Sequence, residues 1–210
     1  MSAGRETKRA VAFFDGQNLF HAAKAAFGYT FPNYDPLLLA KAVCRLKGWA
    51  FAEARFYTGM PSERDNAVWH HFWKARLAQM GRSGVHTCAR ELRYRTQRVR
   101  LSDGTIVRTV VGQEKGIDVR IALDVVRLAQ QNAYDVGVIF SQDQDLSEAA
   151  DDVRLIAREQ RRWIKIASAF PSSPTAKNDR GIDRTDWIAI DRTTYDACID
   201  TRDYRPKPKA

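Results

Sequence analysis

The sequence predicts an α/β fold with a mainly parallel central sheet. Short apolar runs of strand type alternate with longer amphipathic segments, and several of the runs end directly at carboxylates. Strands that alternate with helices are typical of βαβ units, in which covering helices connect parallel strands. The chain has 210 residues, 44% of them hydrophobic, so it is long enough to bury one sizeable core.

The first half of the chain is expected to form three strands, at residues 11–14, 50–58 and 85–89. Amphipathic segments separate them, and a glycine stands where each helix is expected to end. The expected helices are residues 19–27, closed by Gly28, residues 37–46, stopped by Gly48, and residues 62–80, opened by Ser62 and ended by Gly81.

Residues 93–111 contain two β-prone arms around the sequence Ser-Asp-Gly-Thr at residues 102–105. Asp-Gly between alternating residues is a strong hairpin signal, so we expect a β-hairpin insertion at about residues 92–112. The arms carry five arginines: Arg93, Arg95, Arg98, Arg100 and Arg108. Strand alternation puts the first two on one face and the next two on the other.

This hairpin has two interpretations. It can be an arm that grips phosphates, with Tyr94 stacking on a base. It can also be a solvated hairpin whose charges only prevent aggregation. We favour the first interpretation.

The second half of the chain predicts helices at residues 117–131 and 146–160 and strands at 136–140 and 163–169. Residues 171–178 are rich in Pro, Ser and Asn, which is typical of a loop or a boundary. A strand at 187–190, a short helix at 193–199 and a frayed basic tail at 205–210 follow. We therefore expect a main domain over residues 9–170 and a C-terminal extension over 171–210.

Four carboxylates stand at junctions between the predicted elements: Asp15, Asp118, Asp143 and Asp145. Ligands of open α/β sheets bind at the carboxyl ends of the strands, where such residues meet. Unpaired carboxylates repel each other unless a cation lies among them, and their hard oxygens favour Mg²⁺ or Mn²⁺ over zinc. Such an ion can activate water and neutralise charge on a scissile phosphate.

Each of these acids also has a structural interpretation. Asp145 and Glu148 have the spacing of a capping box, which does not exclude metal binding. Asp118 can complement the positive end of its helix, and Asp15 can accept hydrogen bonds from its own turn. Asp143 directly ends a buried strand, so a purely structural role explains it least well.

Asp124 is expected to lie apart from this group. It follows Asp118 by six residues on the same predicted helix, which turns it about 120° away. We expect it on a solvated face, between Arg120 and Arg127.

Composition restricts the partners and the location. Lys and Arg number 34 against 25 Asp and Glu, a net charge of +9, which favours a polyanionic partner such as nucleic acid. The sequence has no run of 18 apolar residues, so no membrane span is expected. The polar residues 1–9 lack the apolar segment of a signal peptide. Three scattered cysteines indicate reduced thiols, so we expect a cytoplasmic protein.

Three segments together resemble the NYN domain family, a branch of the PIN-like nucleases, and within it the LabA-like bacterial branch. FFDGQNLF (residues 13–20) is similar to the family's opening strand with Asp-x-x-Asn. KGIDVRIALDVV (residues 115–126) resembles its Lys-Gly-hydrophobic-Asp helix start. AYDVGVIFSQDQDL (residues 133–146) is similar to its strand followed by Ser-Gly-Asp-Ser-Asp-Phe. The resemblance covers residues 9–170.

The resemblance implies a Rossmann-like (PIN-like) α/β/α sandwich and metal-dependent hydrolysis of RNA phosphodiester bonds, by an endoribonuclease that uses Mg²⁺ or Mn²⁺. It assigns metal binding and catalysis to Asp15, Asp118, Asp143 and Asp145, and it gives Asn18 the role of orienting Asp15 or a metal-bound water. With RNA as substrate, Lys115 and the five hairpin arginines are the expected nucleic-acid-binding residues.

Two positions depart from the family pattern, since Gln142 replaces the usual Gly and Leu146 the usual Phe. Glutamine makes the turn less permissive than glycine does. The alternative function is therefore a non-catalytic RNA-binding or regulatory module that retains the fold. A homo-oligomer or a regulatory protein partner is compatible with either function.

Overall fold

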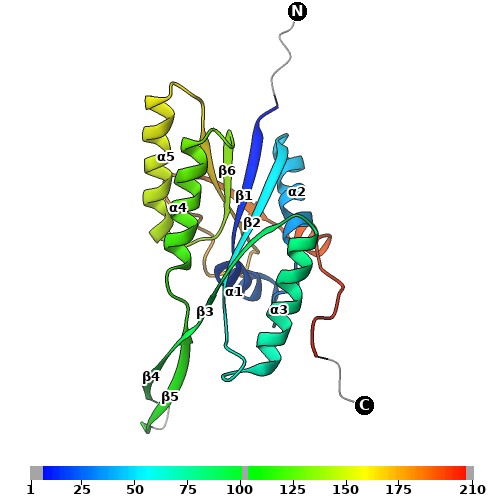
Figure 1. The fold of residues 1–210 in the computed structure, drawn as a ribbon, viewed down its shortest axis with the longest axis vertical. Helices are drawn as coiled ribbons and strands as arrows, with labels where there is room; N and C mark the ends of the chain where they lie inside the picture. The colour runs from blue at the N-terminus through cyan, green and yellow to red at the C-terminus, as the bar shows by residue number, and fades with distance from the viewer. Residues whose placement is uncertain (1–6, 101–103, 207–210) are drawn as a thin grey trace, which may run out of the picture.

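A computed structural model describes residues 7–100 and 104–206, and it confirms the predicted α/β class (Figure 1). The six strands of the central sheet lie in the order β3-β2-β1-β6-β7-β8, and each neighbouring pair is parallel. Their bounds are β1 (Arg9–Asp15), β2 (Ala50–Met60), β3 (His86–Glu91), β6 (Val136–Phe140), β7 (Lys165–Pro171) and β8 (Asp186–Ile190).

Helices cover both faces of this sheet. Helices α4 (Ile117–Gln130) and α5 (Ser147–Glu159) pack on one face, while α1 (Gly16–Phe27), α2 (Pro36–Lys47) and α3 (Ala67–Arg82) lie on the other (Figure 1). In the described part of the chain, no helix combines the length and the apolar character needed to cross a membrane.

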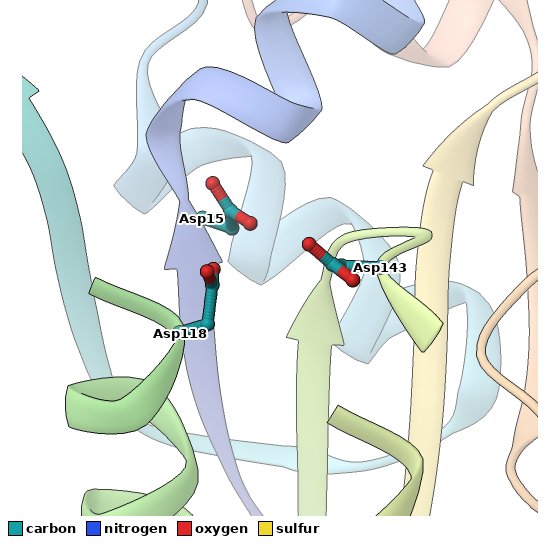
Figure 2. Close-up of side chains that lie close together, drawn as sticks. All are labelled: Asp15, Asp118 and Asp143. Carbon is teal, nitrogen blue, oxygen red and sulfur yellow. The ribbon is translucent and has the colours of Figure 1, made fainter. Parts of the chain in front are cut away.

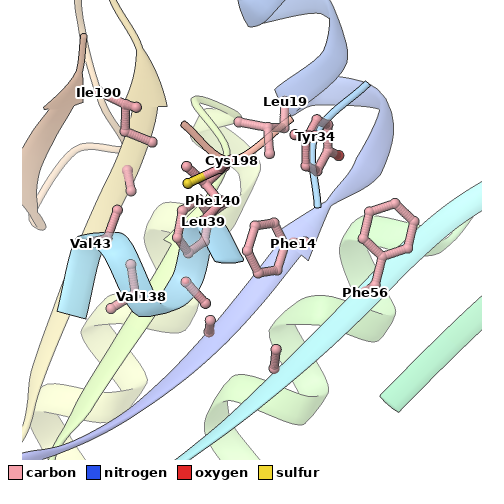
Figure 3. Close-up of a cluster of buried hydrophobic side chains, with 14 of the residues drawn as sticks. Phe14, Leu19, Tyr34, Leu39, Val43, Phe56, Val138, Phe140, Ile190 and Cys198 are labelled. Atoms are coloured by element: carbon pink, nitrogen blue, oxygen red, sulfur yellow. The ribbon is translucent and has the colours of Figure 1, made fainter. Parts of the chain in front are cut away.

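Strand β1 is central because both of its faces are buried. Val11 and Phe13 pack with α4 and α5, whereas Ala12 and Phe14 pack with α1, α2 and α3, as strand alternation requires. The Phe14 ring stacks on that of Phe140 from β6, with centroids 4.0 Å apart (Figure 3). Full burial of one such side chain stabilises the fold by about 1.5–3 kcal/mol, so β1 and β6 are held firmly side by side.

Two predicted helix starts were wrong, and in each case the residue that caps the helix explains the observed start. Helix α1 begins at Gly16, since Asp15 is its N-cap and accepts a hydrogen bond from the Asn18 backbone N–H at 3.0 Å. Helix α3 begins at Ala67, since Asn66 rather than Ser62 caps it. Ser62 instead bonds the Asp65 carboxylate within the preceding turn.

The predicted hairpin is present as β4 (Arg93–Arg100) and β5 (Ile106–Gln113), paired antiparallel and separate from the main sheet. Residues 102 and 103 of its predicted turn lie outside the described residues. The hairpin projects beyond the end of the sheet (Figure 1). It is therefore an appendage rather than part of the core.

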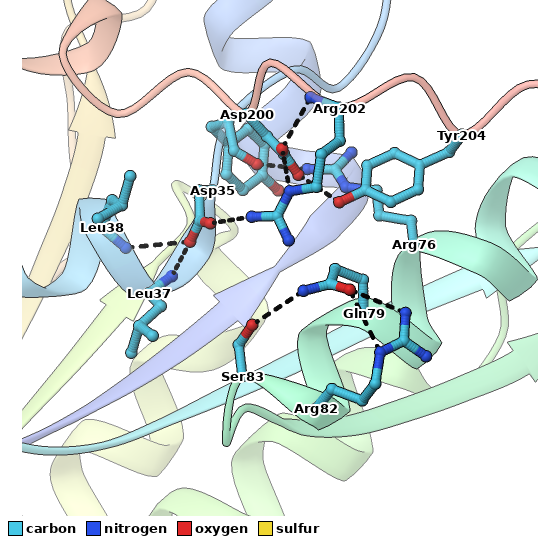
Figure 4. Close-up of polar contacts among 11 residues, drawn as sticks. Asp35, Leu37, Leu38, Arg76, Gln79, Arg82, Ser83, Asp200, Arg202 and Tyr204 are labelled. Carbon is cyan, nitrogen blue, oxygen red and sulfur yellow. Dashed lines mark hydrogen bonds and ion pairs between the residues drawn. The ribbon is translucent and has the colours of Figure 1, made fainter.

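The expected C-terminal extension completes the same core. It supplies β8 and the short helix α6 (Arg192–Asp196), and Tyr195 is fully buried. The chain then runs back over α2 and α3, where Arg202 bridges Asp200 at 2.9 Å and Asp35 at 3.2 Å, and Tyr204 donates to Asp200 (Figure 4). Residues 207–210 of the predicted basic tail lie outside the described residues.

Candidate metal centre

Three of the four predicted acids meet at the carboxyl end of the sheet (Figure 2). Asp15 ends β1, Asp143 follows β6, and Asp118 lies in the first turn of α4. Each offers a carboxylate oxygen, and these oxygens lie within 4.8 Å of one another. Strands β1 and β6 are parallel neighbours, but the chain leaves β1 toward β2 on the opposite side, so the group occupies a topological switch point.

Asp15 is the buried member of this group, with 3% of its surface exposed. Its carboxylate accepts hydrogen bonds from the Asn18 backbone N–H at 3.0 Å and from the Ser141 hydroxyl at 3.2 Å. The pKa of Asp15 is raised to about 6, mainly by burial and also by the negative charges of Asp118 and Asp143, although those hydrogen bonds oppose the rise. The site therefore holds more negative charge than its own donors compensate.

Asp118 shares this environment. Burial raises its pKa, and the charges of Asp143 and Asp145 add to the rise. Gly116, before this helix, adopts φ = +76°, and a side chain there would collide with the guanidinium of Arg90. A glycine at this position thus brings an arginine close to the start of α4.

Glu114 is a further acid near the site that sequence reasoning did not single out. Its carboxylate accepts a hydrogen bond from the backbone N–H of Gly59 on β2. Burial raises the pKa of Glu114 to about 7, and the charges of Asp15 and Asp118 also raise it. The only signal in the sequence was its position, four residues before Asp118. Lys115, which follows it, is exposed.

The loop after β6 is built by side-chain hydrogen bonds. The Asn18 amide oxygen accepts from the Gln142 backbone N–H at 2.9 Å, so Asn18 fixes this loop. Asp143 caps the 3-10 turn η1 (Gln144–Leu146) by accepting from the Asp145 N–H at 3.0 Å.

The capping box predicted for Asp145 was wrong. Helix α5 has Leu146 as its N-cap residue and no side-chain cap bond, because the 3-10 turn capped by Asp143 leads directly into it. Asp145 is exposed and, among the residues that the structure describes, it is not part of the group whose oxygens meet.

Both departures from the family pattern have a structural explanation. Gln142 is buried, and its amide donates to the carbonyls of Arg180 at 2.7 Å and Asn178 at 3.3 Å. It has no positive φ, so this turn does not need glycine. Leu146 is fully buried in the core beneath α4 and α5. Neither residue displaces a carboxylate.

Asp124 does not lie on a solvated face, and that prediction was wrong. It is 2% exposed and accepts a hydrogen bond from the Tyr57 hydroxyl at 2.9 Å. The predicted neighbours are correct, since Arg120 and Arg127 pair with it at 3.1 and 2.9 Å. Asp124 is buried because Tyr57 and its strand β2 cover this side of α4, a contact that helix periodicity alone does not reveal.

The hairpin register divides the five arginines between two faces. Arg98 pairs directly opposite Arg108, and strand alternation places Arg100 and Tyr94 on the same face as this pair. Arg93 and Arg95 lie on the other face. All five are exposed on the hairpin strands.

The residues present fit a small divalent cation. Three carboxylate oxygens from different elements converge, one of them almost fully buried, and burial together with the charges of neighbouring acids raises the pKa values of Asp15 and Asp118. Hard oxygen donors without a nearby thiolate or imidazole in the group favour Mg²⁺ or Mn²⁺. A cation there would relieve the repulsion among the acids and favour their ionised forms despite their burial.

The comparison with protein families is the one that bears on the identity of this chain. No curated protein matches the sequence. Among solved structures, the chain is similar to MurG of Acinetobacter baumannii at 12% identity and a TM-score of 0.32, over 86% of this chain and 45% of that one, which is too weak a likeness to support an argument. The model of the NYN domain matches residues 9–179, most of the chain, and the protein therefore belongs to the NYN domain family.

Proposed function

We propose that this protein is a metal-dependent ribonuclease that hydrolyses RNA phosphodiester bonds, as an endonuclease. The NYN family is nuclease-like, which supports a nuclease at a coarse level. The observation that carries the proposal is the convergence of Asp15, Asp118 and Asp143 at the carboxyl end of the sheet in a chain of net charge +9. In this proposal the carboxylates hold a metal ion, and the surrounding Arg and Lys side chains hold the polyanionic RNA.

In this proposal Asp15, Asp118 and Asp143 hold Mg²⁺ or Mn²⁺. A bound divalent ion would lower the pKa of water and neutralise charge on the scissile phosphate. Asn18 keeps the loop that carries Asp143 against β1 through its bond to the Gln142 backbone. Asp145 has a supporting role, since its charge acts on Asp118.

Basic residues supply the grip on RNA. Lys115 is exposed three residues before Asp118, and the Arg90 guanidinium lies against Gly116. The hairpin arginines extend the positive surface outward.

We also propose a cytoplasmic location. Cys44, Cys88 and Cys198 are free thiols, which supports a reducing compartment.

Cleavage of labelled single-stranded RNA, with and without Mn²⁺, tests this function. The wild-type protein should cleave only with the ion, and Asp143→Asn should lower the rate by at least about 100-fold because a ligand is lost. Asp152→Asn on the exposed face of α5 is the matched control and should retain the wild-type rate. A thermal shift on Mn²⁺ addition, absent in Asp143→Asn, should accompany the loss.

Two results would reject the proposal. Equal residual cleavage by the wild type and Asp143→Asn would show that the activity belongs to a contaminant. Salt-sensitive RNA binding without Mn²⁺-dependent cleavage would favour the non-catalytic RNA-binding module instead.

A further inference from the structure

An aromatic cavity lies next to the carboxylate group. It has a volume of about 360 Å³, within the usual range of small-ligand sites, and its rings come from Phe20, His21, Trp69, Trp73 and Tyr94. Its wall also includes Gly16 and Gln17, directly after Asp15, and Gly59, whose N–H is bonded to Glu114. A ligand in the cavity would therefore lie beside the proposed metal centre.

Two of these rings are presented rather than buried. Trp69 is 38% exposed and Tyr94 is 36% exposed, whereas Trp73 is 8% exposed. The Trp69 ring is held edge-on by Phe72, with centroids 5.0 Å apart. The Tyr94 ring lies across its strand partner Gly112, where an added Cβ would come within 3.0 Å of it. Both surfaces are therefore preorganised for a flat partner.

The hairpin connects this cavity to positive charge. From Tyr94, the same face of the hairpin continues to the directly opposed pair Arg98 and Arg108, and to Arg100. Like charges directly across a strand pair destabilise it, and an anion between them removes that cost. Aromatic rings that lead into opposed arginines match the alternation of base and phosphate in a nucleic-acid strand.

We propose that the cavity binds one unpaired nucleobase of a single-stranded nucleic acid, stacked on Trp69 and Tyr94, while the adjoining phosphates follow the Arg98–Arg108 face of the hairpin. This inference rests on the proposed function. With one base in the cavity, the adjacent nucleotide of the substrate would lie beside the metal centre. It implies a preference for single strands, since a duplex must unstack and unpair a base before the base can enter.

Equilibrium binding in EDTA tests the inference without any cleavage. The probes are a short fluorescein-labelled single-stranded RNA and an abasic strand of equal length. Trp69→Ala and Tyr94→Ala should each weaken RNA binding by about 5-fold to 100-fold, as the loss of base stacking does. Their affinity for the abasic strand should stay within about twofold of the wild type, because that strand has no base to stack.

Two matched variants separate stacking from general damage. Trp69→Phe should restore most of the RNA affinity, since a ring remains. Trp163→Ala removes another exposed tryptophan, which lies by Lys8 and Lys165, outside this cavity, and should change neither affinity. Circular dichroism should show native helix content for each variant.

The inference is overturned if both alanine variants bind RNA within about twofold of the wild type. It is also overturned if they lose affinity for the RNA and the abasic strand equally. Because no metal is present, these outcomes are independent of the nuclease assay. Wild-type cleavage by Asp143→Asn would reject the nuclease proposal and leave the binding result intact.

Discussion

Neutralising Asp15 should stabilise the metal-free protein, although the residue is buried and hydrogen-bonded. Its pKa lies at about 6 in the folded state, against an ordinary value of 3.8. The unfolded chain therefore releases this proton first, and the stability of the wild type falls as the pH rises from about 4 to 6. Above that range the ionised Asp15 costs roughly 3 kcal/mol.

Asp15→Asn should recover up to roughly that amount at pH 7.5, since asparagine can still cap α1. The gain should shrink to about 1 kcal/mol at pH 4.5, where the wild-type carboxyl is mostly protonated in the fold. Urea denaturation in EDTA at the two pH values measures both numbers. With Mg²⁺ at 100 times its Kd, the wild type should gain about 2.7 kcal/mol and the variant should gain little.

Asp124→Asn is the matched control, because Asp124 is equally buried but lies among arginines. It should lose about 1–3 kcal/mol at pH 7.5, since charge-assisted hydrogen bonds are removed. A loss of stability in Asp15→Asn at pH 7.5, comparable with that of Asp124→Asn, would refute the account of uncompensated charge.

Contacts of Gln142, Arg98 and Gly116 give three further predictions. Gln142→Ala should lower the free energy of unfolding by about 1–3 kcal/mol in urea denaturation, because two hydrogen bonds of the buried Gln142 amide to the Asn178 and Arg180 carbonyls are lost; an unchanged midpoint would contradict the tether. Arg98→Ala should reduce the slope of log K for RNA against log salt by about 1 in fluorescence titrations, and an unchanged slope would remove this arginine from the phosphate path. Gly116→Ala should lower the Tm in a thermal melt by several degrees, because alanine is strained at the positive φ of this position; a melt equal to the wild type would show that this turn is relaxed.

Much of the fold was predictable because the signals were local. The strand over residues 136–140 and the stop at Gly48 agree with the structure, since a buried apolar run and a helix-ending glycine depend on few neighbours. The start of α3 was misplaced because Ser62 and Asn66 are both good caps, and only packing chooses between them. The convergence of Asp15, Asp118 and Asp143 was expected because the carboxyl ends of parallel strands share one edge.

Other features depend on contacts between distant segments. The proximity of Glu114 to the site arises from Gly59 on another strand, and the use of Gln142 as a tether depends on carbonyls near residue 180. The cavity between α1, α3 and the hairpin has no local sequence pattern at all. Trp69 was predicted as part of an amphipathic helix, but nothing in that spacing could show that its ring stays half-exposed.

Anomalous diffraction from Mn²⁺-soaked crystals tests the central claim most directly. The account predicts one principal peak within about 2 Å of oxygens from Asp15, Asp118 and Asp143, and its loss in crystals of Asp143→Asn. A principal peak elsewhere, or one that contacts Asp145 without Asp15, would contradict a metal centre built from these three carboxylates.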